Sequence, residues 1–194
     1  MNVKPKVTID VDGILCDLYT PILLFAYQEY GKIVKLKSFS SPSDKLEEII
    51  KEFLDDHNRL TTCLPYSDAK DSLSLLSKEY DLVIGTARFE DLIPITRNWL
   101  TKHELTPYIS NFIIREYNER CNTFKLRASK DSVAIIDDSS NVITELSNRK
   151  RNIFTVRRPW NQSIKDSDHV SVYPSLMECS LDMIRKKSSI KHGF

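Results

Sequence analysis

The sequence predicts an α/β fold in which a doubly wound parallel sheet carries helices on both faces. Three observations predict it. Short apolar runs typical of buried strands recur along the chain, helical segments alternate with them from Leu64 onward, and polar residues follow several of the apolar runs directly. Alternating strands and helices imply right-handed crossovers, and such crossovers build a parallel sheet.

Each predicted strand is an apolar run bounded by polar or turn residues. The strands are expected at residues 7–9, 82–84, 109–114, 133–136, 153–156 and, as a short late strand, 169–172. The helices are expected at residues 21–30, 40–56, 68–79, 90–103, 141–148 and 175–187, with a further short helix that begins near Lys125. The helix at 21–30 should end at Gly31, which suits the left-handed position after a helix.

The helix at 40–56 has the clearest local signals. Ser41 can cap its first turn and Pro42 suits the first helical position. Apolar residues then recur at helical spacing and form one face, which needs a packing partner: Leu46, Ile49, Ile50, Phe53 and Leu54. The helix at 21–30 could supply that partner.

The connection between the first two sheet strands is unusually long. A simple strand-helix-strand unit needs only about 30 residues, and the excess here is helical. We therefore predict that residues 18–63 form a small helical cap inserted after the first strand, while residues 1–17 and 64–194 form the α/β core. The alternative is a core helix followed by a structural hairpin.

Length, composition and charge favour a soluble globular protein of one domain, or of one domain with a small insertion. The 194 residues carry a net charge of +1, with 41% hydrophobic and 28% charged residues, so no global field attracts nucleic acid or a membrane. We expect a cytoplasmic location, because no apolar run could span a bilayer and no signal-peptide pattern is present. The four cysteines lack C-x-x-C spacing and are expected to be reduced thiols. A homodimer is expected only from the general frequency of such assemblies.

Two carboxylates follow the first strand. Asp10 and Asp12 are two residues apart, so they should project from the strand end on the same side, and Gly13 can take the turn that follows. Close carboxylates repel one another unless a cation lies beside them. Mg²⁺ would fill that role, since it prefers oxygen ligands and binds through carboxylates and phosphate.

Polar residues also follow two later strands. Thr86 comes after the strand at 82–84, and Asp137 and Asp138 come after the strand at 133–136. Ligands of doubly wound sheets bind outside the carboxyl ends of the strands, so these side chains should meet Asp10 and Asp12 at one edge. Taken singly, Thr86 could be a turn residue and the Asp137-Asp138 pair could cap a helix.

This ordered set resembles the haloacid-dehalogenase superfamily of phosphohydrolases, which have a Rossmann-like core and often a cap. The resemblance implies that Asp10 is the nucleophile and becomes an aspartyl-phosphate, while Asp12 acts as general acid and then general base. It implies Mg²⁺ held by the Asp10 carboxylate, the Asp12 backbone carbonyl and Asp137. Asp138 would assist as a ligand through water or as an orienting partner.

The resemblance also implies two further catalytic residues. Thr86 would donate its hydroxyl to a phosphoryl oxygen, and a lysine would stabilise phosphoryl charge and hold Asp10 in place. Lys125 and Lys130 both precede the acidic pair. Lys125 is favoured, because Lys130 looks like a solvated turn residue.

Several segments are similar to the 5′(3′)-deoxyribonucleotidase family. They are residues 10–17, residues 64–69, Thr86-Ala87-Arg88 and Arg158-Pro159-Trp160-Asn161. The similarity implies a small phosphate monoester as substrate, specifically a nucleoside monophosphate. Thr86, Ala87, Arg88 and Arg158 would then lie against the phosphate, and Trp160 could stack on a base. Other aromatic residues could also stack or simply pack in the core: Tyr19, Phe25, Phe39 and Phe89.

Three other functions stay open from the sequence. The same catalytic residues serve a phosphatase of sugar phosphates or other small metabolites. The fold could also carry a catalytically silent phosphate-binding or regulatory protein. A phosphatase of nucleic-acid ends is disfavoured by the near-neutral charge, although residues 148–151 and the C-terminal residues are locally basic.

Overall fold

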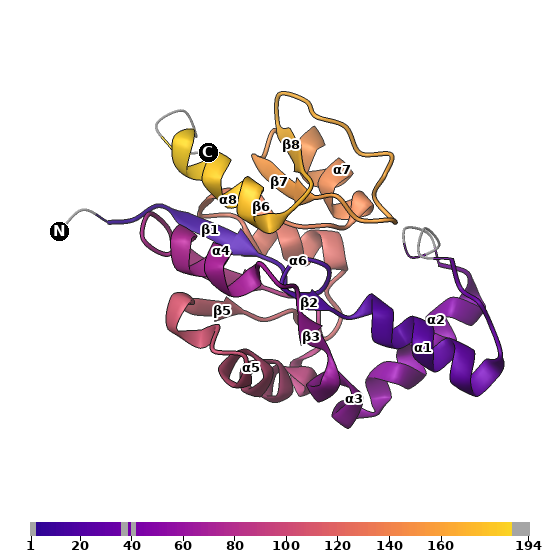
Figure 1. Cartoon of the computed structure of the whole chain (residues 1–194). Helices are drawn as coiled ribbons and strands as arrows, with labels where there is room; N and C mark the ends of the chain where they lie inside the picture. The colour runs from indigo at the N-terminus through magenta and orange to yellow at the C-terminus, as the bar shows by residue number, and fades with distance from the viewer. Residues whose placement is uncertain (1–2, 36–38, 40–41, 188–194) are drawn as a thin grey trace.

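The sheet has the predicted α/β architecture. The structure is a computed structural model that describes residues 3–35, 39 and 42–187. Its main sheet has six strands in the order β5-β4-β1-β6-β7-β8, and every neighbouring pair is parallel (Figure 1). The strands are β1 (Lys6–Ile9), β4 (Asp81–Gly85), β5 (Asn111–Ile113), β6 (Ser132–Ile136), β7 (Ile153–Val156) and β8 (Val170–Tyr173).

Helices cover the two faces of this sheet. On one face α4 (Ala69–Leu76) packs against α8 (Leu176–Arg185), and on the other α6 (Cys121–Ala128) packs against α7 (Ser140–Asn148) (Figure 1). The predicted helix at 90–103 is divided into a 3-10 turn, η2 (Glu90–Leu92), and α5 (Ile93–Lys102), which has Pro94 in its first turn. A second short turn, η3 (Thr106–Tyr108), precedes β5.

Three helices lie between β1 and β4 in addition to α4. They are α1 (Tyr19–Tyr30), α2 (Asp44–Asp55) and α3 (His57–Thr62), and they form a group to one side of the sheet (Figure 1). Two short strands, β2 (Cys16–Asp17) and β3 (Leu64–Pro65), pair antiparallel where the chain enters and leaves this group. Helices therefore occupy this long connection, while the division into a cap at residues 18–63 and a core stays a prediction. The sequence did not predict β2, β3 or α3.

Local capping residues mark the end of α1 and the start of α2. Gly31 ends α1 with φ 60°, as predicted, and its N–H donates to carbonyls of the last turn. The predicted first helical position, Pro42, is wrong, because the helix begins at Asp44 and the Ser43 hydroxyl accepts from the Leu46 N–H. The predicted cap, Ser41, lies outside the described residues.

The apolar face of α2 packs on α1. Leu46, Ile49 and Phe53 are buried, and the Phe53 ring lies 5.8 Å from that of Phe25 on α1. The expected partner of this face is thus confirmed.

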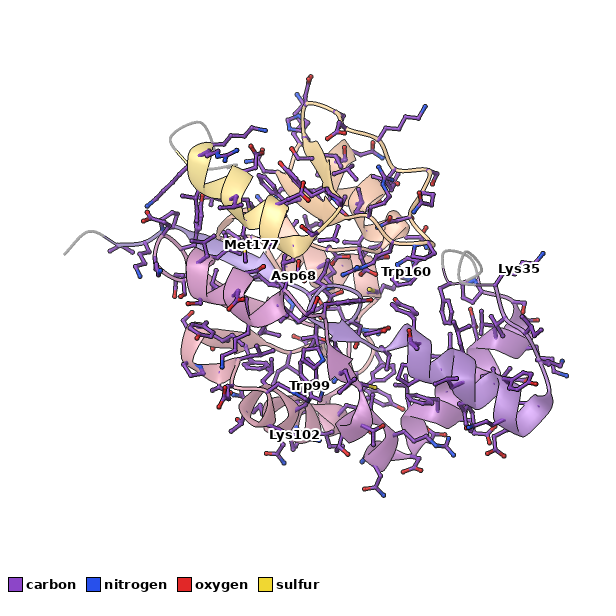
Figure 2. The ribbon with its side chains drawn as sticks, viewed as in Figure 1. Lys35, Asp68, Trp99, Lys102, Trp160 and Met177 are labelled. Atoms are coloured by element: carbon purple, nitrogen blue, oxygen red, sulfur yellow. The ribbon has the colours of Figure 1, made fainter. Side chains whose placement is uncertain are left out.

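Side chains of α5 bind the segment that leads out of the three-helix group into β3. Trp99 of α5 donates its indole N–H to the Cys63 carbonyl at 2.7 Å, and the Lys102 ammonium donates to the Thr61 carbonyl at 3.1 Å; Figure 2 labels both donors. The Asp68 carboxylate, at the start of α4, accepts from the backbone N–H of Met177 at 3.0 Å. These contacts fix the segments that flank the sheet edge.

Two bulk expectations can be compared with the structure. The described cysteines are free thiols, as predicted, and Cys16, Cys63 and Cys179 are buried. Among the described helices, not one combines the length and the apolar character that a bilayer crossing requires.

Candidate active site

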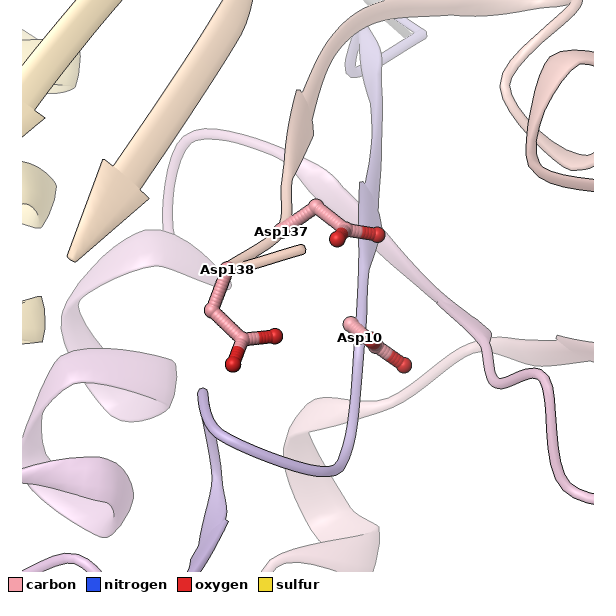
Figure 3. Close-up of side chains that lie close together, drawn as sticks. All are labelled: Asp10, Asp137 and Asp138. Atoms are coloured by element: carbon pink, nitrogen blue, oxygen red, sulfur yellow. The ribbon is translucent and has the colours of Figure 1, made fainter. Parts of the chain in front are cut away.

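The predicted acidic residues meet at the carboxyl edge of the central strands. Asp10 follows β1, Asp137 and Asp138 follow β6, and these two strands are neighbours in the sheet. The Asp10 N–H donates to the Ile136 carbonyl at 3.0 Å, which continues the pairing to the strand ends. Figure 3 shows the three aspartates close together at this edge. We call Asp10, Asp137 and Asp138 the acidic cluster.

The acidic cluster is buried and crowded. Its members are 8%, 0% and 2% exposed, and one carboxylate oxygen from each lies within 4.8 Å of the others. Burial raises the pKa of Asp10 to about 7, with Lys125 opposing the shift and Asp137 and Asp12 adding to it. Burial, followed by the charges of Asp137 and Asp10, raises the pKa of Asp138 well above its ordinary value. The site therefore favours the binding of positive charge.

Lys125 supplies one positive charge. Its ammonium is 2.8 Å from Asp10 Oδ1 and 2.8 Å from Asp137 Oδ2, and the side chain is 1% exposed. Burial opposes its charge, but the two carboxylates together raise the pKa of Lys125 above its ordinary value. Lys130 is exposed. The structure thus brings Lys125 to the site, although α6 begins four residues before it rather than near it.

The oxygens that remain determine whether a metal fits. Asp137 Oδ1 accepts the Ser139 N–H at 2.9 Å, and Asp137 Oδ2 faces Lys125. Asp10 Oδ2 and Asp138 Oδ1 accept no hydrogen bond that the described residues donate, and Asp137 Oδ2 is paired with the Lys125 ammonium by charge without a well-aligned hydrogen bond. Two such oxygens, in a group of three carboxylates with one contacting cation, suit a hard divalent ion such as Mg²⁺. On this geometry Asp138 is at least as well placed as Asp137 to be a direct ligand.

The Asp12 carboxylate lies apart from the acidic cluster and pairs with Arg88. The Arg88 guanidinium donates from Nε to Asp12 Oδ2 at 2.9 Å and from Nη2 to Asp12 Oδ1 at 2.6 Å. Its Nη1 donates to the Thr96 hydroxyl at 3.0 Å, and Arg88 as a whole is 6% exposed. Such two-pronged pairing fixes both groups. Sequence reasoning placed Arg88 on the phosphate and missed this pair, for which the sequence carries no signal.

Thr86 and Ala87 line the end of β4. Thr86 is fully buried and its hydroxyl accepts the Arg88 N–H at 3.2 Å, which forms a tight turn. The Ala87 carbonyl accepts from Arg115 at 3.3 Å. Thr86 can be a turn residue and also contact a phosphate, because its hydroxyl oxygen accepts the Arg88 N–H and its hydroxyl proton is still available to donate.

The loop after β7 contacts the site's own residues. Arg158 Nε donates to the Gly13 carbonyl at 2.7 Å, and the Trp160 indole N–H donates to Asp138 Oδ2 at 2.7 Å. Gly13 has φ 80°, and a Cβ there would lie 1.9 Å from Asp138 Oδ2. Only glycine therefore fits between the two loops. The predicted substrate contacts of Arg158 and Trp160 stay predictions.

The aromatic residues separate into two groups. The rings of Tyr19 and Trp160 lie 3.9 Å apart and that of Phe39 is 4.6 Å from Tyr19, so this group packs on itself beside Asp138. Phe25 packs with Phe53 inside the insertion. Phe89 is 45% exposed, follows the Thr86 turn and lines a cavity.

Comparisons with known proteins identify the fold. No protein-family model matches the chain, and no curated protein sequence matches it either. Among solved structures, a haloacid dehalogenase-like hydrolase from Streptococcus pneumoniae aligns with a TM-score of 0.67 and 13% identity, over 94% of this chain and 100% of that one. A protein from Clostridium acetobutylicum described as a predicted phosphatase aligns with a TM-score of 0.67 and 13% identity, over 95% and 100% of the two chains.

An L-2-haloacid dehalogenase from Xanthobacter autotrophicus is similar as well. It aligns with a TM-score of 0.62 and 12% identity, over 95% of this chain and 99% of that one. Because these likenesses span nearly the whole of each chain, they include the helical insertion as well as the sheet. The chain therefore has the Rossmann-like α/β fold of haloacid dehalogenase-like hydrolases.

Proposed function

We propose that the protein is a Mg²⁺-dependent phosphomonoesterase that acts through a phosphorylated Asp10, with nucleoside 5′-monophosphates as its substrates. The observation that carries the proposal is the acidic cluster with Lys125 at the carboxyl edge of the sheet. Proteins with this fold include a dehalogenase, so the fold alone does not select the reaction. One lysine does not balance the charge of three buried carboxylates. The site therefore favours a reaction in which a bound cation supplies the remaining positive charge and also attracts a phosphate.

Asp10 is the proposed nucleophile. One of its carboxylate oxygens forms a bond to phosphorus while the bond from phosphorus to the ester oxygen breaks. Asp12 gives a proton to that leaving oxygen. Lys125 balances the negative charge of the phosphoryl oxygens and keeps Asp10 oriented, and the Thr86 hydroxyl donates to a phosphoryl oxygen.

Water then completes the reaction. A water oxygen attacks phosphorus, Asp12 accepts its proton, and the bond between phosphorus and Asp10 breaks to release phosphate. Mg²⁺, held by the Asp10 and Asp138 or Asp137 carboxylates, would supply charge neutralisation between phosphate and carboxylates when bound.

The substrate's leaving group needs space beside the Thr86 turn. A cavity of about 860 Å³ lies there, lined by Phe89, Glu90, Asp91, Tyr117 and Asn118. Phe89 and Tyr117 are exposed, at 45% and 84%. Arg115 already lies over one face of the Phe89 ring, 4.8 Å from its centroid, so a planar base would stack on the ring surface that stays exposed. The Tyr19, Phe39 and Trp160 rings already contact one another. We therefore place the base at Phe89 and Tyr117 rather than at the Trp160 group.

The test is phosphate release from a panel of nucleoside monophosphates and sugar phosphates. Wild-type protein is assayed with Mg²⁺ and with EDTA, next to Asp10→Asn and the control Asp131→Asn, whose side chain is exposed. Mg²⁺-dependent release from nucleotides by wild type and the control, but not by Asp10→Asn, would support the proposal. Release from sugar phosphates alone would keep the mechanism and refute the substrate. No release from any compound by folded protein would favour a silent, phosphate-binding protein.

The base position has its own test. Phe89→Ala is expected to raise KM for nucleotides at least severalfold while KM for sugar phosphates, which carry no planar ring, stays near the wild-type value. Equal KM values for nucleotides in wild type and variant would remove the base from this cavity.

A further inference from the structure

The loop between β7 and β8 joins the two loops that carry the proposed site. Arg158 holds the Gly13 carbonyl after β1, and Trp160 holds the Asp138 carboxylate after β6. Asn161 adds a hydrogen bond to the Asp138 backbone carbonyl at 3.1 Å and is itself fixed to the Val156 carbonyl at 3.0 Å. Asp138 is thereby held through both its side chain and its backbone.

Trp160 has a second partner on the insertion. Its ring centroid lies 3.9 Å from that of Tyr19, the first residue of α1, and 6.2 Å from that of Phe39. The side chain of Trp160 is labelled in Figure 2, between the core and the helical insertion. Trp160 is 6% exposed, so the aromatic contacts and the backbone fix the plane of its indole. One residue thus contacts the insertion with its ring and the acidic cluster with its N–H.

This hydrogen bond selects which Asp138 oxygen faces a cation. The indole N–H occupies Oδ2, and Oδ1 accepts no hydrogen bond from the described residues. A neutral donor on one carboxylate oxygen restricts rotation of the carboxylate and adds no positive charge that would repel the cation. Loss of such outer partners typically weakens metal binding about 10- to 100-fold.

We propose that Trp160 is a positioning residue that sets the affinity of the acidic cluster for a divalent cation and, through Tyr19, makes that affinity depend on the placement of α1. The inference rests on the metal site of the proposed function. The geometry that carries it is the pair of contacts that Trp160 makes, 2.7 Å to Asp138 and 3.9 Å between ring centroids to Tyr19. Movement of α1 would change the orientation of the indole ring, and with it the orientation of the Asp138 carboxylate.

The test is the affinity for Mg²⁺ alone, measured by calorimetry on the full chain without substrate. Trp160→Phe keeps a ring but removes the N–H donor, and it is expected to weaken binding about tenfold. Tyr19→Leu leaves the N–H in place but removes the stacked ring, and a loss of about threefold is expected. Tyr27→Leu is the matched control, because Tyr27 lies on the same helix and is 60% exposed.

Thermal unfolding without metal separates positioning from folding. The inference requires that the affinity loss of Trp160→Phe persists in protein that is fully folded at the assay temperature. Wild-type affinity in folded Trp160→Phe would overturn the inference, and wild-type affinity in Tyr19→Leu would overturn its link to α1. Absence of Mg²⁺ binding by wild type itself would instead refute the proposed function.

Fluorescence gives an independent readout. The chain has two tryptophans, so Trp99→Phe leaves Trp160 as the only indole. Its emission is expected to change with Mg²⁺ at the concentrations that calorimetry gives, while emission of the Trp160→Phe protein, which reports Trp99, stays constant. A response from Trp99 with none from Trp160 would contradict the proposal.

Discussion

Replacing Lys125 by methionine should destabilise the metal-free protein by about 3–5 kcal/mol at pH 8 and by less at pH 5. Methionine keeps the length of the buried side chain but removes the charge that contacts Asp10 and Asp137. Loss of one partner from a buried ion pair leaves an uncompensated charge, which typically costs about 3–5 kcal/mol. At low pH a protonated Asp10 carries no charge, so only the contact with Asp137 still contributes and the cost falls.

The pKa of Asp10 fixes the direction of this pH dependence. Its folded value of about 7 lies above its ordinary value of 3.8, so the folded state binds the proton more tightly. Stability from this group is therefore present at low pH and is lost as pH rises from about 4 to about 7. One pKa unit corresponds to about 1.4 kcal/mol, so Asp10 contributes a change of about 4 kcal/mol over that window. Because Lys125 lowers the pKa of Asp10, its removal should enlarge the loss and extend it to higher pH.

Urea denaturation with EDTA at about pH 5 and about pH 8 measures this effect. Lys130→Met is the matched control, because Lys130 is exposed and its charge contacts neither aspartate. The control should stay within about 0.5 kcal/mol of wild type at both pH values. A Lys125→Met loss that matches the control, or one that is equal at both pH values, would refute the electrostatic account of the site.

Three further predictions concern single contacts. Gly13→Ala should lower the free energy of unfolding, measured with urea, by about 3 kcal/mol or more, because a Cβ would lie 1.9 Å from Asp138 Oδ2. Gly31→Ala is the control: a Cβ there meets open space, so only the backbone strain of about 1–2 kcal/mol is expected. Equal losses in the two variants would contradict this reasoning. Trp99→Phe should cost about 1–2 kcal/mol by leaving the buried Cys63 carbonyl without its donor, and a neutral result would show that the bond does not hold the insertion. Arg88→Lys should lower kcat at least tenfold with KM little changed, because Lys cannot hold both Asp12 oxygens, and a change confined to KM would instead place Arg88 on the substrate.

Sequence reasoning could predict the sheet and the meeting of the acidic residues for one physical reason. Buried parallel strands are short apolar runs, and the residues that follow them must lie at one edge of the sheet. Asp10, Asp137 and Asp138 meet there, and Lys125 of α6 lies 2.8 Å from both Asp10 and Asp137. None of these placements depends on the exact ends of an element.

Contacts between distant side chains could not be predicted. Asp12 and Arg88 were both assigned to the substrate side of the site, yet they pair with each other across 76 positions of the chain. Trp160 was assigned to a base, and its hydrogen bond to Asp138 was not predicted. Hydrogen bonds of this kind depend on loop conformation and leave no periodic pattern in the sequence.

Short elements were missed for a related reason. β2 and β3 have two residues each, too few for an alternating pattern, and α3 has six. The start of α6 lies four residues before Lys125, and Arg120, which precedes the helix, makes no side-chain cap. Local signals therefore located long elements and failed where tertiary contacts fix short ones.

The most direct test of the central claim is the mass of the protein quenched in acid during turnover of the best substrate of the panel with Mg²⁺. The account predicts that part of the wild-type protein carries one added phosphoryl group, on the peptide that contains Asp10, and that Asp10→Asn carries none. Turnover with no phosphoryl group on any wild-type peptide under rapid quenching, or with the group on a different residue, would contradict nucleophilic attack by Asp10.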